Sequence, residues 1–162
     1  KEVLTIIDYK NLINLDLKTI LKVNFESNLK NDLDKLIVET FKSLFSLINT
    51  ERVEVSWTHV DLQEANILIN KEKIKVIDWE SADKRFYLYD YFTFFSKIRS
   101  NISLNKSISN FSAKFKNDMN FIYLLLIEEL RFSLNEEFSL NFFSSGQKTK
   151  KLCVDILNYI NE

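Results

Sequence analysis

The residues best suited to chemistry lie in one short stretch, "WTHVDLQEANILINKEKIKVIDWE", which runs from Trp57 to Glu80. Its polar candidates, with the only histidine of the chain among them, are His59, Asp61, Asn66, Asp78 and Glu80. Asp61 precedes Asn66 by five residues, and Asp78 follows Asn66 by twelve. A carboxylate can take a proton from a reacting hydroxyl group, and amide and carboxylate oxygens are ligands that Mg²⁺ prefers. The stretch therefore predicts a site that handles a proton beside a metal ion.

The spacing of these groups matches what phosphoryl transfer requires. That reaction needs a hydroxyl held in line with the γ-phosphate, a carboxylate that takes its proton, and Mg²⁺ that neutralises the phosphate oxygens. Asp61 is the candidate base, and Asn66 and Asp78 are the candidate metal ligands. We also expect the carboxylates of Asp61, Asp78 and Glu80 to crowd one cleft and to repel one another unless a cation is bound.

Three motifs, "HVDLQEANILI", "VIDWE" and "LYDY", follow one another in this order. They resemble the C-terminal lobe of the aminoglycoside phosphotransferase and choline kinase family, which are small-molecule kinases with the protein-kinase-like fold. The detailed resemblance covers about Ser56 to Tyr91. It implies that Asp61 is the catalytic base and that Asn66 and Asp78 bind magnesium.

The resemblance also implies supporting roles around the catalytic loop. His59 and Asp90 would brace this loop, His59 through a ring contact with nearby backbone and Asp90 through the loop backbone or as a helix cap. Two alternatives remain for Glu80: a solvated residue beyond the strand, or a group that supports the metal ligands and occasionally binds the metal itself.

The sequence departs from the family pattern at three places. Val60 stands where family members usually have glycine, and Gln63 stands where a second histidine is frequent. Arg85-Phe86-Tyr87 replaces a common Gly-Asp-Pro turn. These changes bear on the geometry of the loop and on the class of acceptor, and they leave the expected metal ligands in place.

Hydrophobic periodicity predicts the elements that must position the site. We expect helices over residues 8–23, 28–49, 88–98, 118–135 and 148–159, and loops or short helices over 101–110 and 135–146. Val53, Val55 and Trp57 alternate with polar residues, and "NILIN" with "KIKVID" predicts an antiparallel hairpin. The predicted fold class is α+β and mostly α, as in the C-terminal lobe of the protein-kinase-like fold with a small β-hairpin that carries the catalytic loop.

Composition limits the other possibilities. A chain of 162 residues with 46% apolar residues can form one domain over residues 1–162. The net charge of −1 gives no reason to expect a nucleic-acid or membrane partner. Cys153 is the only cysteine, which favours the cytoplasm and excludes an internal disulfide. With one glycine there is no glycine-rich phosphate loop, so we expect the N-terminal nucleotide lobe to be missing and the chain to be a fragment, inactive alone.

The predicted function is the ATP- and Mg²⁺-dependent transfer of the γ-phosphate to a hydroxyl of a small molecule, of aminoglycoside, choline, amino-alcohol or sugar type. The expected partners are ATP, this acceptor and the N-terminal lobe of the same protein. One alternative is a non-catalytic kinase-like binding module, and another is a metal-dependent hydrolase. Acidic residues of the later helices could bind a cationic acceptor if they face the cleft, but solvated helix faces are the favoured prediction; these residues are Asp118, Glu128 and Glu129.

Overall fold

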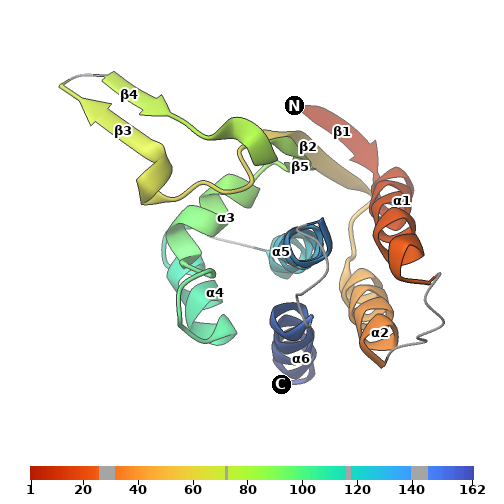
Figure 1. Cartoon of the computed structure of the whole chain (residues 1–162). Coiled ribbons are helices and arrows are strands. Elements are labelled where there is room, and N and C mark those ends of the chain that lie inside the picture. Colours follow the sequence, from red (N-terminus) through yellow and green to blue (C-terminus); the bar gives the residue numbers. More distant parts are fainter. Residues whose placement is uncertain (26–31, 72, 116–117, 140–145) are drawn as a thin grey trace. The chain divides into compact units, whose positions relative to one another are not determined.

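The computed structural model of the chain describes residues 1–25, 32–71, 73–115, 118–139 and 146–162 (Figure 1). Its residues group into two compact units. The first unit consists of Lys1–Val3 and Glu54–Asp118, and the second consists of Leu4–Val53 and Met119–Glu162. Helices and small antiparallel sheets make up the elements, which confirms the predicted α+β class.

A three-stranded sheet leads into the candidate site. Its strands lie in the order β1 (Glu2–Thr5), β2 (Arg52–Thr58) and β5 (Asp83–Phe86), and β2 pairs antiparallel with β5. Val53 and Val55 are buried, as the alternating pattern predicts, but the Trp57 side chain is 71% exposed. The sequence pattern predicts neither β1 nor β5, because these strands are short and β5 contains three charged residues in "DKRF".

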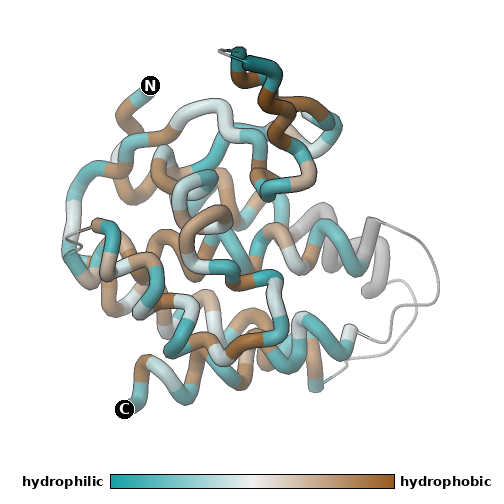
Figure 2. Tube along the Cα trace, turned by 90° about the vertical axis from the view of Figure 1, so that its left-hand side faces the viewer, coloured by the Kyte–Doolittle hydropathy of each residue, from teal (hydrophilic) through white to brown (hydrophobic). Residues whose placement is uncertain are grey.

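The predicted hairpin is confirmed. Strand β3 (Ile67–Asn70) pairs antiparallel with β4 (Lys73–Val76), and Ile67 lies opposite Val76. Two 3₁₀ helices flank the hairpin, η1 (Glu64–Asn66) before β3 and η2 (Trp79–Ser81) after β4. Figure 2 shows short hydrophobic and hydrophilic stretches following one another along the Cα trace. The hairpin thus brings the beginning of β3 and the end of β4 to the same end of one small sheet.

Two helices complete the first unit. α3 (Tyr89–Ser96) corresponds to the helix predicted over 88–98, and α4 (Leu104–Ser112) occupies a region predicted as loop or short helix. Ser103 caps α4, because its hydroxyl accepts a hydrogen bond from the Lys106 N–H at 3.3 Å. The two helices pack through aromatic rings, with Phe92 and Phe111 edge to face at 5.3 Å between ring centroids.

The second unit contains four helices, α1 (Ile6–Phe25), α2 (Asp32–Leu47), α5 (Met119–Ser139) and α6 (Gln147–Asn161). α5 packs against α1, α2 and α6, and α2 also packs against α6. The helices predicted over 8–23, 118–135 and 148–159 are confirmed, as is the described part of the helix over 28–49. The segment predicted as loop or short helix over 135–146 is helical to Ser139, and residues 140–145 lie outside the described residues. In the described parts of the chain, no helix combines the length and the apolar character needed to cross a membrane.

One prediction about α5 is wrong. Glu128 and Glu129 are 0% and 5% exposed, whereas the sequence predicted solvated positions, and only Asp118 is exposed. Because α5 packs against three helices, it leaves little of its middle to solvent. The Glu128 carboxylate accepts a hydrogen bond of 2.6 Å from the Tyr9 hydroxyl, and Arg131 lies 3.4 Å away. Buried charge is tolerated there because it is paired and hydrogen-bonded.

Candidate catalytic site

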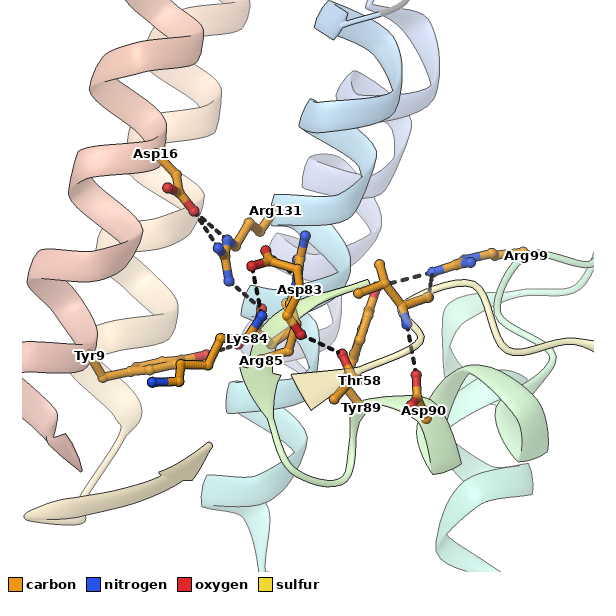
Figure 3. A network of polar contacts seen from close by, with 12 residues as sticks. Tyr9, Asp16, Thr58, Asp83, Lys84, Arg85, Tyr89, Asp90, Arg99 and Arg131 are labelled. Carbon is orange, nitrogen blue, oxygen red and sulfur yellow. Dashed lines mark hydrogen bonds and ion pairs between the residues drawn. The ribbon is translucent and has the colours of Figure 1, made fainter. Parts of the chain in front are cut away.

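Asp90 fixes the backbone of the loop that follows β2. Its carboxylate accepts the His59 N–H at 2.7 Å and the Val60 N–H at 2.8 Å. In Figure 3, Asp90 and Arg99 reach the end of β2 from two directions. The contact with the loop backbone that the resemblance implied is present, whereas the helix cap is not, because Leu88 occupies the N-cap position of α3.

Val60 adopts a backbone conformation that β-branched residues avoid. Its φ angle is 71°, in the left-handed region, and its side chain is 1% exposed. Such a conformation costs on the order of 1–3 kcal/mol and persists only where neighbouring contacts hold it. Asp90 holds the Val60 N–H, and Arg99 Nη2 donates to the Val60 carbonyl at 2.7 Å. A glycine at this position would adopt the conformation without strain.

His59 joins the loop to the end of β4. Its Nε2 lies 2.6 Å from the Ile77 carbonyl oxygen, and because a carbonyl only accepts, Nε2 carries the hydrogen. The ring is 1% exposed and meets the Trp79 ring edge to face at 4.9 Å. Nδ1 makes no hydrogen bond with any part of the chain that the structure describes. His59 is thus a buried contact between two segments, and it does not line the cavity described next.

Asp61 opens on a cavity of about 270 Å³ that lies within the first unit. Its side chain is 28% exposed and both carboxylate oxygens have donors. Arg99 forms an ion pair with Oδ1, and Gln63 Nε2 donates to Oδ2 at 2.9 Å. These donors fix the orientation of the carboxylate. The cavity is lined by Asp61, Leu62, Gln63, Glu64, Ala65, Thr93, Phe94, Lys97, Arg99 and Ser100.

Arg99 is the residue of the site that the sequence did not reveal. It follows α3 by three residues and contacts the Asp61 carboxylate, the Val60 carbonyl and the Tyr89 hydroxyl, the last at 3.2 Å. No motif contains it, since it lies 38 residues after Asp61 in a turn without periodicity. Only the fold of the first unit brings this guanidinium to the loop.

The predicted metal ligands lie at the open end of the hairpin, Asn66 just before β3 and Asp78 two residues after β4. Asn66 Nδ2 donates to the Asp61 carbonyl at 3.0 Å, which leaves the amide oxygen Oδ1 as the atom for a cation. Asp78 follows β4 and is exposed, with a φ angle of 64°. Its carboxylate makes no hydrogen bond that caps η2. The Ile77 N–H bonds the Asn66 carbonyl at 2.9 Å and so ties the segment before Asp78 to η1. The Asn66 amide oxygen and the Asp78 carboxylate are donors of the kind that Mg²⁺ prefers, since Mg²⁺ binds oxygen ligands and keeps several waters.

The predicted crowding of three carboxylates is wrong. Asp78 and Glu80 are exposed and do not line the cavity on which Asp61 opens. Across the described residues, no three His, Cys, Asp or Glu side chains gather closely enough to hold a metal ion. The reason is geometric: Asp61 lies before η1, and η2 carries Glu80 past the end of β4 into solvent. Glu80 thus takes the solvated position of its two predicted alternatives.

Comparison of the chain with protein-family models, with curated proteins and with solved structures gives no match. The assignment of a function to this site therefore depends on the geometry of its own residues.

Proposed function

We propose that this chain is the C-terminal catalytic and substrate-binding lobe of an ATP-dependent phosphotransferase with the protein-kinase-like fold, which transfers the γ-phosphate to a hydroxyl of a small molecule. One observation carries the proposal: the Asp61 carboxylate opens on a cavity while the Asp61 carbonyl binds the amide of Asn66. A candidate base and a candidate metal ligand are thereby held in one short loop. The compartment we propose is the cytoplasm, where ATP is available and where the single buried Cys153 would stay reduced.

In the proposed reaction, the acceptor hydroxyl lies in the cavity and donates its hydrogen bond to the Asp61 carboxylate. The hydroxyl oxygen forms a bond to the γ-phosphorus, its proton passes to Asp61, and the bond from the γ-phosphorus to the bridging oxygen breaks to release ADP. Asn66 and Asp78 would hold Mg²⁺, which neutralises charge on the phosphate oxygens when it is bound. Asp90 and His59 would keep the loop in place and would not touch the reacting atoms.

The proposal is tested by assaying the full-length protein for transfer of the γ-phosphate of Mg-ATP to a panel of small hydroxyl compounds. We expect turnover that requires Mg²⁺, and thermal stabilisation by Mg²⁺ with nucleotide that Asp78→Ala abolishes. Glu136→Ala, which removes an exposed carboxylate from α5, is the matched control and should keep both properties. Release of phosphate from a substrate without ATP would instead favour the metal-dependent hydrolase.

A non-catalytic binding module is the second candidate, because Arg99 and Gln63 already occupy both oxygens of the Asp61 carboxylate. Such engagement would suit a carboxylate that only holds the loop together. The coding sequence upstream of Lys1 separates the two candidates. A glycine-rich hairpin and a strand with a lysine there favour the enzyme, and an unrelated domain favours the module.

A further inference from the structure

The charged side chains around the cavity carry information about the acceptor. Four of the ten lining residues are charged: the carboxylates Asp61 and Glu64, and the cations Lys97 and Arg99. Asp61 and Arg99 form an ion pair with each other. Arg99 therefore already neutralises the charge of the Asp61 carboxylate. This carboxylate offers little attraction to a positively charged acceptor.

Lys97 is the cation of the lining that has no ion pair or hydrogen-bond partner for its ammonium group among the described residues. Its backbone is well fixed, because Lys97 ends α3 with a φ angle of 54° and its carbonyl accepts the Ser100 N–H at 2.8 Å. A lysine after a helix also interacts favourably with the helix dipole, but this role does not require it to face a cavity. Its ammonium group is available to a ligand that reaches Asp61.

The size of the cavity limits the acceptor further. A volume of about 270 Å³ lies just below the range of about 300–1,000 Å³ that is usual for pockets holding drug-sized ligands. Glu64 is the one remaining carboxylate of the lining. A polycation of several sugar rings would need several uncompensated carboxylates, and the lining offers it only one.

We propose that the acceptor is a small hydroxy compound with one anionic group, a carboxylate or a phosphate, that is held by Lys97 while its hydroxyl faces Asp61. This inference rests on the proposed function and narrows it. It separates this site from the cationic acceptors, aminoglycosides and choline, that the resemblance implies. Arg99 makes the arrangement possible, because its positive charge offsets the repulsion between the Asp61 carboxylate and an anionic acceptor.

Binding is measured first, with full-length protein and with glycerate, glycerol 3-phosphate, glycerol and choline as probes. Glycerate carries a carboxylate and glycerol 3-phosphate carries a phosphate, so these two probes show which anionic group is bound. Glycerol has the hydroxyl groups without a charge, and choline has a hydroxyl group with a positive charge. We expect one of the two anionic probes to bind at least tenfold more tightly than glycerol or choline. A charge-assisted hydrogen bond supports a tenfold or larger effect.

Substitution of Lys97 then tests its role. Lys97→Ala should weaken binding of the anionic probe at least tenfold and leave glycerol unaffected, and Lys97→Arg should restore most of the binding. Lys97→Gly removes the same charge while relieving the positive φ angle, so a folding defect in Lys97→Ala does not hide the result. Lys106→Ala removes an exposed lysine of α4 outside the cavity and should change nothing.

The outcomes separate this inference from the proposed function. Tight binding of an anionic probe through Lys97 without phosphate transfer would support the ligand class and overturn the kinase. Phosphate transfer to choline or to an aminoglycoside, undiminished in Lys97→Ala, would support the kinase and overturn the ligand class. Failure of both anionic probes to bind more tightly than glycerol would also overturn the ligand class. If an anionic acceptor is turned over, Lys97→Ala should raise KM at least tenfold with little change in kcat, as expected for a binding contact.

Discussion

The Arg99 guanidinium forms an ion pair with the Asp61 carboxylate and so joins the turn after α3 to the loop after β2. The same side chain donates to the Val60 carbonyl, next to the two N–H groups that Asp90 holds. Two side chains from one helix and its following turn thus determine the conformation of a loop that lies 30 to 39 residues earlier in the chain. Any function of Asp61 depends on this arrangement.

Replacing Asp90 should destabilise the first unit. Asp90→Ala leaves the N–H groups of His59 and Val60 without their acceptor, and each lost charge-assisted hydrogen bond costs about 1.5–3 kcal/mol. We expect a decrease of about 3 kcal/mol in the free energy of unfolding, measured by urea denaturation. Asp90→Asn keeps one acceptor oxygen and should lose about half as much. An unfolding midpoint for Asp90→Ala equal to that of the wild type would mean that the carboxylate does not hold the loop.

Val60 offers a test of backbone strain. Val60→Ala and Val60→Gly both empty a buried site, and glycine removes one more carbon. On burial alone Val60→Gly should be the less stable variant, but at a φ angle of 71° glycine avoids a conformational cost of on the order of 1–2 kcal/mol. We therefore predict that Val60→Gly is at least as stable as Val60→Ala in thermal unfolding. If Val60→Gly is less stable than Val60→Ala by more than about 1 kcal/mol in the free energy of unfolding, the backbone at this residue is not strained.

In the second unit, the buried charges of α5 should be sensitive to loss of one partner. Arg131 lies between Glu128 at 3.4 Å and Asp16 at 2.5 Å and is 4% exposed (Figure 3). Arg131→Met leaves the Glu128 carboxylate buried without its cation, a loss that typically costs about 3–5 kcal/mol. The double variant Arg131→Met with Glu128→Gln should recover part of this free energy of unfolding. Additive effects of the two substitutions would show that the residues do not interact.

The buried thiol of Cys153 should make the free energy of unfolding depend on pH. Burial raises the pKa of its thiol from 9.0 to about 11, against smaller opposing effects of hydrogen bonds from the Thr40 side chain and the Cys153 backbone. A raised pKa in the folded state means that the unfolded state loses its proton first, so this contribution to stability is complete below pH 9 and is lost as pH rises towards 11. Burial also raises the pKa of Tyr159, which acts in the same direction.

The free energy of unfolding should therefore decrease between pH 8.5 and 11, and it should decrease less steeply in Cys153→Ala. The comparison uses the slopes against pH, because loss of the thiol also leaves a small cavity that lowers stability at every pH. Identical slopes for the two proteins would exclude the thiol as a source of this pH dependence.

Much of the fold was predictable because the relevant signals are local. The apolar residues of α2 recur with helical spacing, and Ile37, Phe41 and Leu44 are indeed buried. The hairpin β3–β4 was predictable from two apolar runs around a polar turn. The loop residues His59, Asp61 and Asn66 were found by their spacing; Asp61 and Asn66 are in contact, and His59 contacts the Ile77 carbonyl.

The remaining features depend on tertiary contacts that no local pattern encodes. Arg99 has no motif, and its contact with Asp61 exists only because α3 returns the chain to the loop. Glu128 looks like a solvated residue in the sequence, but packing of α5 against its neighbours buries it beside Tyr9. The exposed position of Glu80 depends on the direction in which η2 leaves the end of β4.

The most direct test of the central claim is the rate of phosphate transfer from Mg-ATP by full-length protein with Asp61→Asn. Asparagine keeps the size of the side chain and an oxygen that accepts from Arg99, but it cannot take the proton of the acceptor hydroxyl. We predict that kcat decreases at least 100-fold, that the thermal midpoint changes by only a few degrees, and that Glu136→Ala retains wild-type turnover. Turnover by Asp61→Asn close to that of the wild type would contradict the assignment of Asp61 as the base.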